Sequence, residues 1–436
     1  MTVMDNLQLI GKSLAFFVPY ACRQLPRRIA AIYHSWTYKS TSSAQNVVVL
    51  GGSFAGITLA KRLTETLPTG YKVVLVEKRS HFNYSFNFPR YSVLQGYEHT
   101  AFIPYDGLKE SAPSGIYTHV QDTVGSISNT EVLLASGKSI PYRFLAIATG
   151  ASQPLPVQVS ANERDAACLE LRYVQQSIKD SQKIAIIGAG AVGIELATDI
   201  KDFYPDKNVT LIHPYGQVLN RFGKRLHGYV LPVLEKLKIR CLFHERPSLP
   251  QGDSFLKDTT LTFSDGHQEK FDLVIGCTGQ RPNSSLLTSL LPNSISEATS
   301  RILVQPTLQV SDTKDSNQRV FAFGDVAEHG GPMMARAGMF QAEVVLANIM
   351  AMIHGRVPRK VYTPRRDIEG AIKLTLGRAH NAIYTMDDDG SELLVVSHKG
   401  QLDHDCSRAW KELGADIKLA KPVVDSVVND AHFCKV

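Results

Sequence analysis

Two glycine-rich stretches constrain this chain of 436 residues more than any other feature. Residues 47–56 have the sequence VVVLGGSFAG, and residues 184–193 have the sequence IAIIGAGAVG. Each joins a short apolar run, predicted to be a parallel strand, to a segment rich in Ala and Leu, predicted to be a helix. Backbone N–H groups and the positive end of the helix dipole stabilise a diphosphate at such a turn. One stretch alone is weak evidence, but two of them predict two dinucleotides that face each other.

The first turn departs from the usual pattern at one position. Gly51 allows the tight turn, and Gly56 lets the helix pack closely on the strand. Ser53 stands where a glycine usually lets the backbone approach the pyrophosphate, but serine is small and can donate a hydrogen bond to phosphate. Glu77 ends the next predicted strand, 21 residues beyond Gly56, where a carboxylate accepts hydrogen bonds from ribose hydroxyls. The alternative is a generic doubly wound domain in which this glutamate is incidental.

The second turn has all three glycines, Gly188, Gly190 and Gly193, but no acidic residue at the end of the following strand. His213 occupies that position, 20 residues after Gly193. An acid there favours the free 2′-hydroxyl of NADH, whereas a base accommodates the 2′-phosphate of NADPH. The histidine therefore argues against strict selectivity for NADH.

Each of three charged residues near the second turn can be interpreted in two ways. Arg221 and Lys224 either support the use of NADPH or are solvated surface charges. Glu195, two residues after Gly193, either faces the nicotinamide or complements the helix N-terminus.

These motifs resemble the two-dinucleotide-binding flavoprotein superfamily. More closely, they resemble its apoptosis-inducing-factor-2/ferroptosis-suppressor branch, which is related to type II NADH dehydrogenases. The matching stretches are residues 51–56, 145–150, 188–195, 199–213, 277–283 and 320–327. The resemblance implies FAD at the first turn and NAD(P)H, the electron donor, at the second. Its motifs are specific for the fold and the flavin, and much less so for the final electron acceptor.

The resemblance also implies further flavin-site residues. Asp325, after Gly324, would bond the ribityl or phosphate region, Arg90 matches a flavin-contacting arginine, and Val120 starts the strand against the adenine. Thr149 and Gly150 would close the loop where the chain crosses between domains. Together with the turn residues, the candidate cofactor-binding residues are Gly51, Gly52, Ser53, Phe54, Ala55, Gly56, Glu77, Arg90, Val120, Thr149, Gly150, Gly188, Gly190, Gly193, Glu195, His213, Gly324 and Asp325. No catalytic side chain and no metal ligand is assigned, and residues 403–406, with the sequence DHDC, are interpreted as a polar loop.

Disulfide reductases of the same superfamily carry a redox-active cysteine pair after the first ribose-binding strand. Residues 81–90 occupy that region here and contain no cysteine, and none of the six cysteines forms a C-x-x-C motif. Scattered single cysteines indicate a reducing compartment. Without a dithiol, electrons must leave directly from the flavin to a quinone, to oxygen or to another small acceptor.

The N-terminal segment, residues 1–44, has an amphipathic pattern. Apolar residues recur at helical spacing, at Leu7, Ile10, Leu14, Phe17 and Ala21, and after Pro26 at Ile29, Ile32, Tyr33 and Trp36. The longest uncharged apolar stretch, residues 13–22, is too short to span a bilayer. The pattern favours a helix in a membrane interface, attracted to anionic lipid by its basic residues. A mitochondrial presequence and a helix packed on the protein's own body are the alternatives.

Charge narrows the possible partners. The net charge is +6, and residues 1–46 hold five Lys or Arg against one Asp. The remainder is nearly balanced, which argues against a nucleic-acid partner.

The predicted fold class is α/β, with two nested Rossmann-like domains, for FAD and for NAD(P), and a C-terminal α+β cap. The predicted boundaries are 45–155 with 291–355 for the FAD domain, 156–290 for the NAD(P) domain and 356–436 for the cap. The predicted function is hydride transfer from NAD(P)H to FAD and electron transfer to a quinone-like acceptor. A tailoring oxidoreductase of a phenolic or quinonoid metabolite and a non-enzymatic signalling flavoprotein are the alternatives. We expect a peripheral membrane or cytoplasmic location, with a mitochondrial one as an alternative, while the oligomeric state stays open.

Overall fold

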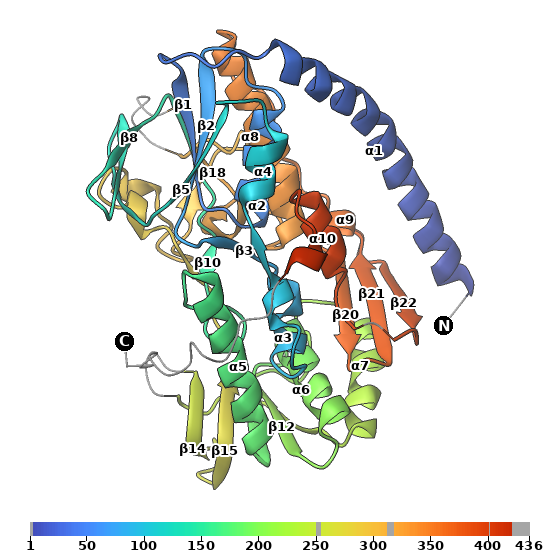
Figure 1. Cartoon of the computed structure of the whole chain (residues 1–436). Helices are drawn as coiled ribbons and strands as arrows, with labels where there is room; N and C mark the ends of the chain where they lie inside the picture. The colour runs from blue at the N-terminus through green and yellow to red at the C-terminus, as the bar shows by residue number, and fades with distance from the viewer. Residues whose placement is uncertain (1–2, 250–253, 312–317, 401, 421–436) are drawn as a thin grey trace.

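The first turn follows the central strand of a five-stranded parallel sheet in the computed structural model, which describes residues 3–249, 254–311, 318–400 and 402–420 (Figure 1). The strand order is β18-β9-β1-β2-β5, so the chain leaves this sheet and returns to its edge much later in the sequence. The strands are β1 (Gln45–Leu50), β2 (Tyr71–Glu77), β5 (Tyr117–Gln121), β9 (Phe144–Ile147) and β18 (Val320–Ala322).

The second turn lies in another five-stranded sheet, of order β13-β12-β11-β15-β14. All neighbours in it are parallel except β14 and β15, which are antiparallel. Its strands are β11 (Lys183–Ile187), β12 (Asn208–His213), β13 (Arg240–Phe243), β14 (Phe255–Thr262) and β15 (Gln268–Gly276). The α/β class with parallel sheets, predicted from the two glycine-rich stretches, is confirmed.

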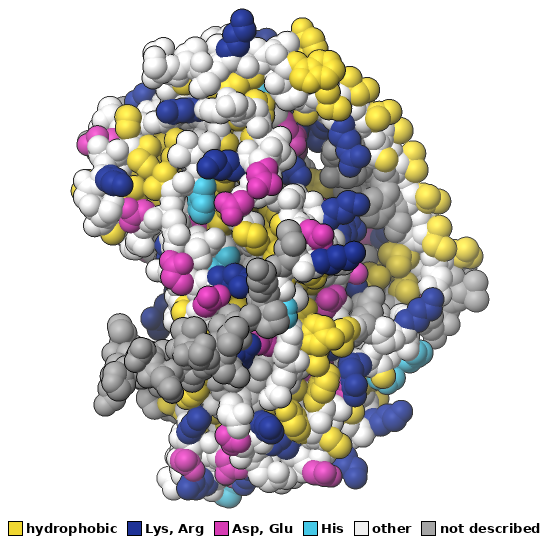
Figure 2. Space-filling model, in the orientation of Figure 1, with side chains coloured by type: hydrophobic (Ala, Val, Ile, Leu, Met, Phe, Trp, Pro, Cys, Tyr) yellow, Lys and Arg dark blue, Asp and Glu magenta, His cyan; other side chains and the backbone are white. Residues whose placement is uncertain are grey.

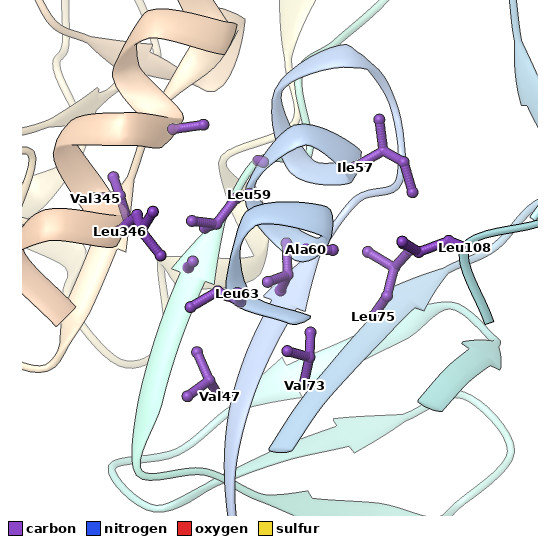
Figure 3. Close-up of a cluster of buried hydrophobic side chains, with 14 of the residues drawn as sticks. Val47, Ile57, Leu59, Ala60, Leu63, Val73, Leu75, Leu108, Val345 and Leu346 are labelled. Atoms are coloured by element: carbon purple, nitrogen blue, oxygen red, sulfur yellow. The ribbon is translucent and has the colours of Figure 1, made fainter. Parts of the chain in front are cut away.

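Helices cover both sheets. On the first sheet, Leu59 and Leu63 of α2 lie between Val47 of β1 and the α8 residues Val345 and Leu346 (Figure 3). All of these side chains are buried, as expected for β-branched strands and an apolar helix stripe that meet in one core. The helices are α2 (Phe54–Thr64) and α8 (Ala335–Ile353) on the first sheet, and α5 (Arg164–Asp180), α6 (Ala191–Phe203) and α7 (Lys224–Lys236) around the second.

The chain crosses between the two sheets at a pair of short antiparallel strands, β10 (Ala151–Ser152) and β16 (Arg281–Pro282). Short elements extend the part around the first sheet. They are β3 (His81–Asn83), α3 (Phe88–Tyr91), β4 (Phe102–Pro104), α4 (Asp106–Ser111), β6 (Val124–Ile127), β7 (Glu131–Leu134), β8 (Ser139–Pro141), β17 (Ile302–Leu303) and β19 (Ala327–Glu328), with 3-10 turns at Ser85–Asn87, Glu98–Ala101, Ser285–Leu287, Pro292–Ser294 and Gly324–Val326.

A smaller antiparallel sheet of order β20-β21-β22 follows α8. It packs on α6 and on α7, where the hydroxyl of Tyr384 accepts a 2.8 Å hydrogen bond from the backbone N–H of Gly223. The elements are α9 (Arg366–Glu369), β20 (Ile372–Leu376), β21 (His380–Met386), β22 (Glu392–Ser397), α10 (Cys406–Glu412) and a 3-10 turn at Ile417–Leu419.

The N-terminal segment forms a single helix of 35 residues, α1 (Val3–Thr37), although it contains Pro19 and Pro26. This helix runs along the outside of the molecule, from beside β22 to the start of β1 (Figure 1). Within the described residues, no helix is both long enough and apolar enough to cross a bilayer.

Candidate dinucleotide-binding sites

The first turn has the geometry that its glycines predict. Gly51 has φ of +95°, which only glycine adopts without strain. A Cβ atom at Gly56 would overlap the carbonyl oxygen of Gly51, so only glycine lets α2 begin this close to β1. Ser53 precedes the helix in an extended conformation, is exposed, and makes no capping hydrogen bond through its side chain. The first N–H groups of α2 therefore lack a capping side chain and are available to an anion.

Glu77 closes one side of this turn. Its Oε2 accepts a 2.7 Å hydrogen bond from the backbone N–H of Gly52, and its Oε1 accepts one of 3.0 Å from the N–H of Arg79. Tyr105 closes the other side, because its buried hydroxyl donates to the carbonyl oxygen of Gly52 at 3.0 Å. Tyr105 was not predicted, because it follows β4 and has no sequence motif around it.

Three candidate residues from distant segments lie beside the first turn. The 3-10 turn at Gly324–Val326 approaches α2 so closely that a Cβ atom at Gly324 would lie 3.3 Å from the Cβ of Ala55. Asp325 follows Gly324, and burial raises the pKa of its carboxyl group, while Arg301 acts in the opposite direction. Val120 of β5 is the register partner of Val76, next to Glu77.

Thr149 and Gly150 lie at the crossing between the two sheets. The hydroxyl of Thr149 donates to the carbonyl oxygen of Asn283 at 2.8 Å, and the Asn283 side chain donates back to the Thr149 carbonyl at 2.9 Å. The backbone N–H of Asn283 also donates to the carbonyl oxygen of Gly150 at 2.9 Å. Asn283 lies in a stretch that matches the family but had no predicted role. In the structure, its hydrogen bonds to Thr149 and Gly150 hold the two crossing segments together.

Phe54, the first residue of α2, belongs to an aromatic group. Its ring centroid lies 4.9 Å from that of Phe82, 4.8 Å from that of Phe86 and 6.2 Å from that of Tyr84. The Tyr84 hydroxyl donates to the backbone carbonyl of His404 at 2.6 Å. The aromatic group thereby connects the first turn to residues 403–406.

The second turn repeats the backbone of the first. Gly188 has φ of +114°, and a Cβ atom at Gly193 would overlap the carbonyl oxygen of Gly188. Gly190 precedes α6 in an extended conformation without a capping side chain, and a Cβ atom there would meet nothing within 4 Å. The protein's own packing therefore does not require glycine at 190, whereas a closely approaching diphosphate does.

His213 lies at the end of β12, where its Nδ1 accepts a 3.1 Å hydrogen bond from the backbone N–H of Ala189. The loop after β12 also contacts Ala189, because the N–H of Leu219 donates to the Ala189 carbonyl oxygen at 2.8 Å. Burial lowers the pKa of His213, and a hydrogen bond with Asn220 only partly offsets this shift. His213 is therefore neutral at pH 7, while Arg221 and Lys224 are exposed.

Glu195 has a partner that the sequence does not indicate. Its Oε1 accepts hydrogen bonds from the backbone N–H and the hydroxyl of Thr375 on β20, at 3.0 and 3.2 Å. The Nε2 atom of His404 lies 3.5 Å from the same oxygen. The helix that follows the second turn is thus joined to the C-terminal sheet through a buried carboxylate.

Arg90 of α3 forms a buried ion pair, with its Nε 2.8 Å from Oδ2 of Asp199 on α6. Its Nη2 donates to the carbonyl oxygen of Gly377 at 3.0 Å. Burial raises the pKa of Asp199 to about 7, although Arg90 acts to lower it. The contact of Arg90 with flavin stays a prediction, and the structure adds this interdomain ion pair.

Residues 403–406 are held by local contacts. Asp403 accepts hydrogen bonds from the N–H of Cys406, at 3.3 Å, and from the hydroxyl of Tyr91, at 3.4 Å. The Cys406 thiol donates to the carbonyl oxygen of Thr100 at 3.1 Å. Within the described part of the chain, no group of three or more His, Cys, Asp or Glu side chains is arranged to hold a metal ion.

The residues fit two dinucleotides. Both turns present uncapped helix N-termini, and the first also has a carboxylate where a ribose needs an acceptor. Two such turns, each after a parallel strand of its own sheet, define the class of flavin oxidoreductases that use a nicotinamide dinucleotide. The chain belongs to the pyridine nucleotide-disulphide oxidoreductase family, whose model matches residues 45–342.

Curated relatives agree with this family. The chain is 30% identical over 396 residues to Fe-regulated protein 8 of Mycosarcoma maydis, covering 86% of this chain and 96% of that protein. It is 28% identical over 349 residues to human ferroptosis suppressor protein 1, covering 78% of this chain and 88% of that protein. The predicted resemblance to the ferroptosis-suppressor branch is confirmed.

Solved structures share the fold. The sulfide:quinone oxidoreductase of Aquifex aeolicus superposes with a TM-score of 0.64 at 18% identity, covering 81% of this chain and 87% of that one. The water-forming NADH oxidase of Lactobacillus brevis superposes with a TM-score of 0.61 at 17% identity, covering 79% and 76%. The chain is an FAD-dependent NAD(P)H oxidoreductase, as predicted.

Proposed function

We propose that this oxidoreductase passes electrons from NAD(P)H to a quinone-like, lipophilic acceptor. The observation that carries the proposal is the absence of a cysteine from residues 81–90, where family members that reduce disulfides carry a redox pair. The cysteines within the described residues are all free, and burial raises the thiol pKa of Cys168 and of Cys277 to about 12. Such thiols are protonated at neutral pH and are poor nucleophiles, so a small-molecule acceptor fits better than a protein dithiol.

The chain's own residues have two tasks in this reaction. FAD, when bound, accepts two electrons from the nicotinamide and passes them on. We assign the FAD diphosphate to the N-terminus of α2 and its adenosine ribose to Glu77, which already orients the turn through Gly52. We assign the nicotinamide dinucleotide to the N-terminus of α6, beside His213. Orientation of the two dinucleotides is the main contribution that the protein makes.

A protein with the same fold is a sulfide:quinone oxidoreductase, which supports a quinone as the class of acceptor. A lipophilic acceptor dissolves in membranes, so we also propose a peripheral membrane location. The exposed apolar residues of α1 support this location.

Steady-state NAD(P)H oxidation with a panel of acceptors tests the proposal. The panel contains short-chain ubiquinone and menaquinone analogues, a phenolic metabolite set, oxygen and an oxidised dithiol. We expect quinones to give the highest kcat/KM, and the dithiol to give no turnover. A preference for one phenolic metabolite would favour the tailoring oxidoreductase. Flavin reduction without turnover of any acceptor would favour the signalling flavoprotein.

A further inference from the structure

The helix α1 exposes its apolar side. Its large apolar side chains on the outer surface are more than half exposed, from 53% at Val18 to 80% at Trp36. We call this set the outward stripe: Leu7, Ile10, Leu14, Val18, Leu25, Ile29, Ile32, Tyr33 and Trp36. Most of these residues are spaced by three, four or seven, which places them on one side of an α-helix. Figure 2 shows hydrophobic side chains along the outer edge that α1 forms.

Among the described side chains on the opposite side of α1, three bind the body through ion pairs. Asp5 pairs with Arg225 of α7 at 2.8 Å, and Lys12 pairs with Asp387 of the β21–β22 turn at 2.5 Å. Nearer the end of the helix, Arg27 pairs with Glu343 of α8 at 3.1 Å. At 100° per residue, these positions lie about half a turn from the outward stripe. An ordinary surface helix has the reverse arrangement, because it buries its apolar side on the protein.

Because of these ion pairs, basic residues of α1 contact the body of the protein. The sequence alone predicts attraction of the basic N-terminal segment to anionic lipid. In the structure, however, Lys12 and Arg27 pair with acidic residues of the body, and among the described side chains of α1 Arg28 is the only exposed Lys or Arg outside these ion pairs. The outward stripe therefore offers apolar surface and little charge to whatever covers it.

The shape of α1 favours lipid over a second copy of the chain. The helix bows outward, with its convex side away from the body (Figure 1). Two convex helices touch over a short length, whereas a stable protein interface buries roughly 1,000 Å² or more. A fluid lipid surface conforms along the whole stripe. Tyr33 and Trp36, at the C-terminal end of the stripe, are of the residue types enriched at membrane–water interfaces.

We propose that α1 is an interfacial helix that inserts its outward stripe into a zwitterionic or neutral lipid surface without requiring anionic lipid. The ion pairs to α7, to the β21–β22 turn and to α8 hold the body at this surface. The proposal deepens the proposed function, on which it rests for the lipophilic acceptor, by naming the lipid surface that the enzyme meets.

Vesicle flotation of the full-length, FAD-loaded protein tests the proposal. We expect binding to pure phosphatidylcholine vesicles to differ by less than about threefold from binding to vesicles with roughly one-third phosphatidylserine. Binding should also persist when salt is raised to about 0.5 M, because apolar insertion is not screened. Binding that requires phosphatidylserine and is lost in salt would overturn the proposal.

The double variant Leu14→Asp/Ile29→Asp should weaken binding to phosphatidylcholine vesicles at least about tenfold, because two inserted side chains become charged. Ala30→Asp is the matched control, since Ala30 is exposed on α1 outside the stripe, and it should bind within about twofold of wild type. FAD content and the thermal midpoint report on folding of each variant.

Two further measurements separate the possible failures. No binding of wild type to any vesicle, together with a dimer that the double variant abolishes, would overturn the proposal in favour of a second copy on the stripe. Reduction of a water-soluble short-chain quinone, measured without vesicles, tests the proposed function alone and should be unchanged in the double variant. Failure of the wild type to bind any vesicle, together with retained quinone reduction, would contradict only the lipid proposal. Vesicle binding of the wild type without quinone reduction would contradict only the proposed function.

Discussion

The two glycine-rich turns have the same backbone conformation but differ in the residue at the end of the following strand. In both, the first glycine has a positive φ and the last glycine lets the helix approach the strand. In both, the side chain at the end of the next strand accepts a hydrogen bond from the residue after the first glycine. That side chain is the carboxylate of Glu77 in one and the imidazole of His213 in the other. We therefore expect the backbone to set where a diphosphate binds, and the strand-end residue to set which nucleotide is preferred.

The turns also differ in what lies behind their helices. The helix α2 packs on α8 of its own part of the molecule. The helix α6 instead carries two buried carboxylates, Glu195 and Asp199, that bind Thr375 of β20 and Arg90 of α3. The second turn is thus joined to β20 and α3 by polar contacts. We therefore expect substitutions on α6 to disturb more of the molecule than substitutions on α2.

The last glycines give the largest expected effects. Gly56→Ala should yield protein depleted of FAD, and Gly193→Ala should keep FAD but be reduced by NAD(P)H at least about hundredfold more slowly. In each case a Cβ atom would overlap a carbonyl oxygen of the turn and force the helix away, at a cost of about 3 kcal/mol. The ratio of flavin to protein absorbance and stopped-flow reduction measure the two effects. Equal loss of FAD in both variants would show that the turns do not act independently.

The Arg90–Asp199 pair tests the connection behind α6. Arg90→Ala should lower the free energy of unfolding by about 1–3 kcal/mol, because it leaves a buried carboxyl group without its partner. Chemical denaturation measures this change, with Arg408→Ala, at an exposed position of α10, as the control. If Arg90 also contacts the flavin, Arg90→Ala should lose FAD while Asp199→Asn keeps it.

The same pair predicts a pH dependence. Burial raises the pKa of Asp199 to about 7, above an ordinary value of about 4, so the folded protein holds a proton that the unfolded chain releases. The contribution of this group is complete below about pH 4 and is lost as pH rises through about 7. The stability of wild type relative to Asp199→Asn should therefore fall between about pH 4 and about pH 7, by at most about 1.4 kcal/mol per unit, and level off above this range. A constant difference would mean that Asp199 stays ionised throughout.

A change at Asp325 should affect the first turn but not the second, with an effect of intermediate size. Asp325→Ala should weaken FAD binding by about 1.5–3 kcal/mol, the usual contribution of a hydrogen bond to a charged group. Reduction of the remaining flavin by NAD(P)H should be unchanged, because the second turn is intact. Equilibrium titration of the apoprotein with FAD measures the first effect, and Asp388→Ala, at an exposed turn, is the control. Unchanged affinity would remove Asp325 from the flavin site.

His213→Asp should give the smallest effect, about tenfold or 1.4 kcal/mol toward NADH. An aspartate keeps an acceptor near the N–H of Ala189 and adds a charge that repels the 2′-phosphate of NADPH. Wild type, in which His213 is neutral, should use NADH and NADPH within about tenfold of each other. Stopped-flow reduction with each nucleotide gives both ratios, and an unchanged ratio would place His213 away from the ribose.

Local sequence was enough to predict the two turns and the parallel sheets around them. Gly51, Gly56, Gly188 and Gly193 meet steric requirements of a strand–turn–helix unit, which depend on neighbours within a few residues. The amphipathic spacing of α1 was visible for the same reason, because the helical period is a local property. Contacts between distant segments were not visible in this way. Tyr105, Asn283, Thr375 and His404 have no motif, and the fold brings them to the two turns.

The class of fold, the two dinucleotides and the absence of a redox cysteine pair in residues 81–90 could be predicted without the structure, because they follow from residue types at fixed short spacings. The orientation of the amphipathic N-terminal helix depends instead on contacts that form only in the folded protein. A helical period reveals an apolar side but not whether that side faces the protein or the surroundings. The ion pairs of Asp5, Lys12 and Arg27 with three distant segments turn that side outward, and no pattern within α1 could reveal them.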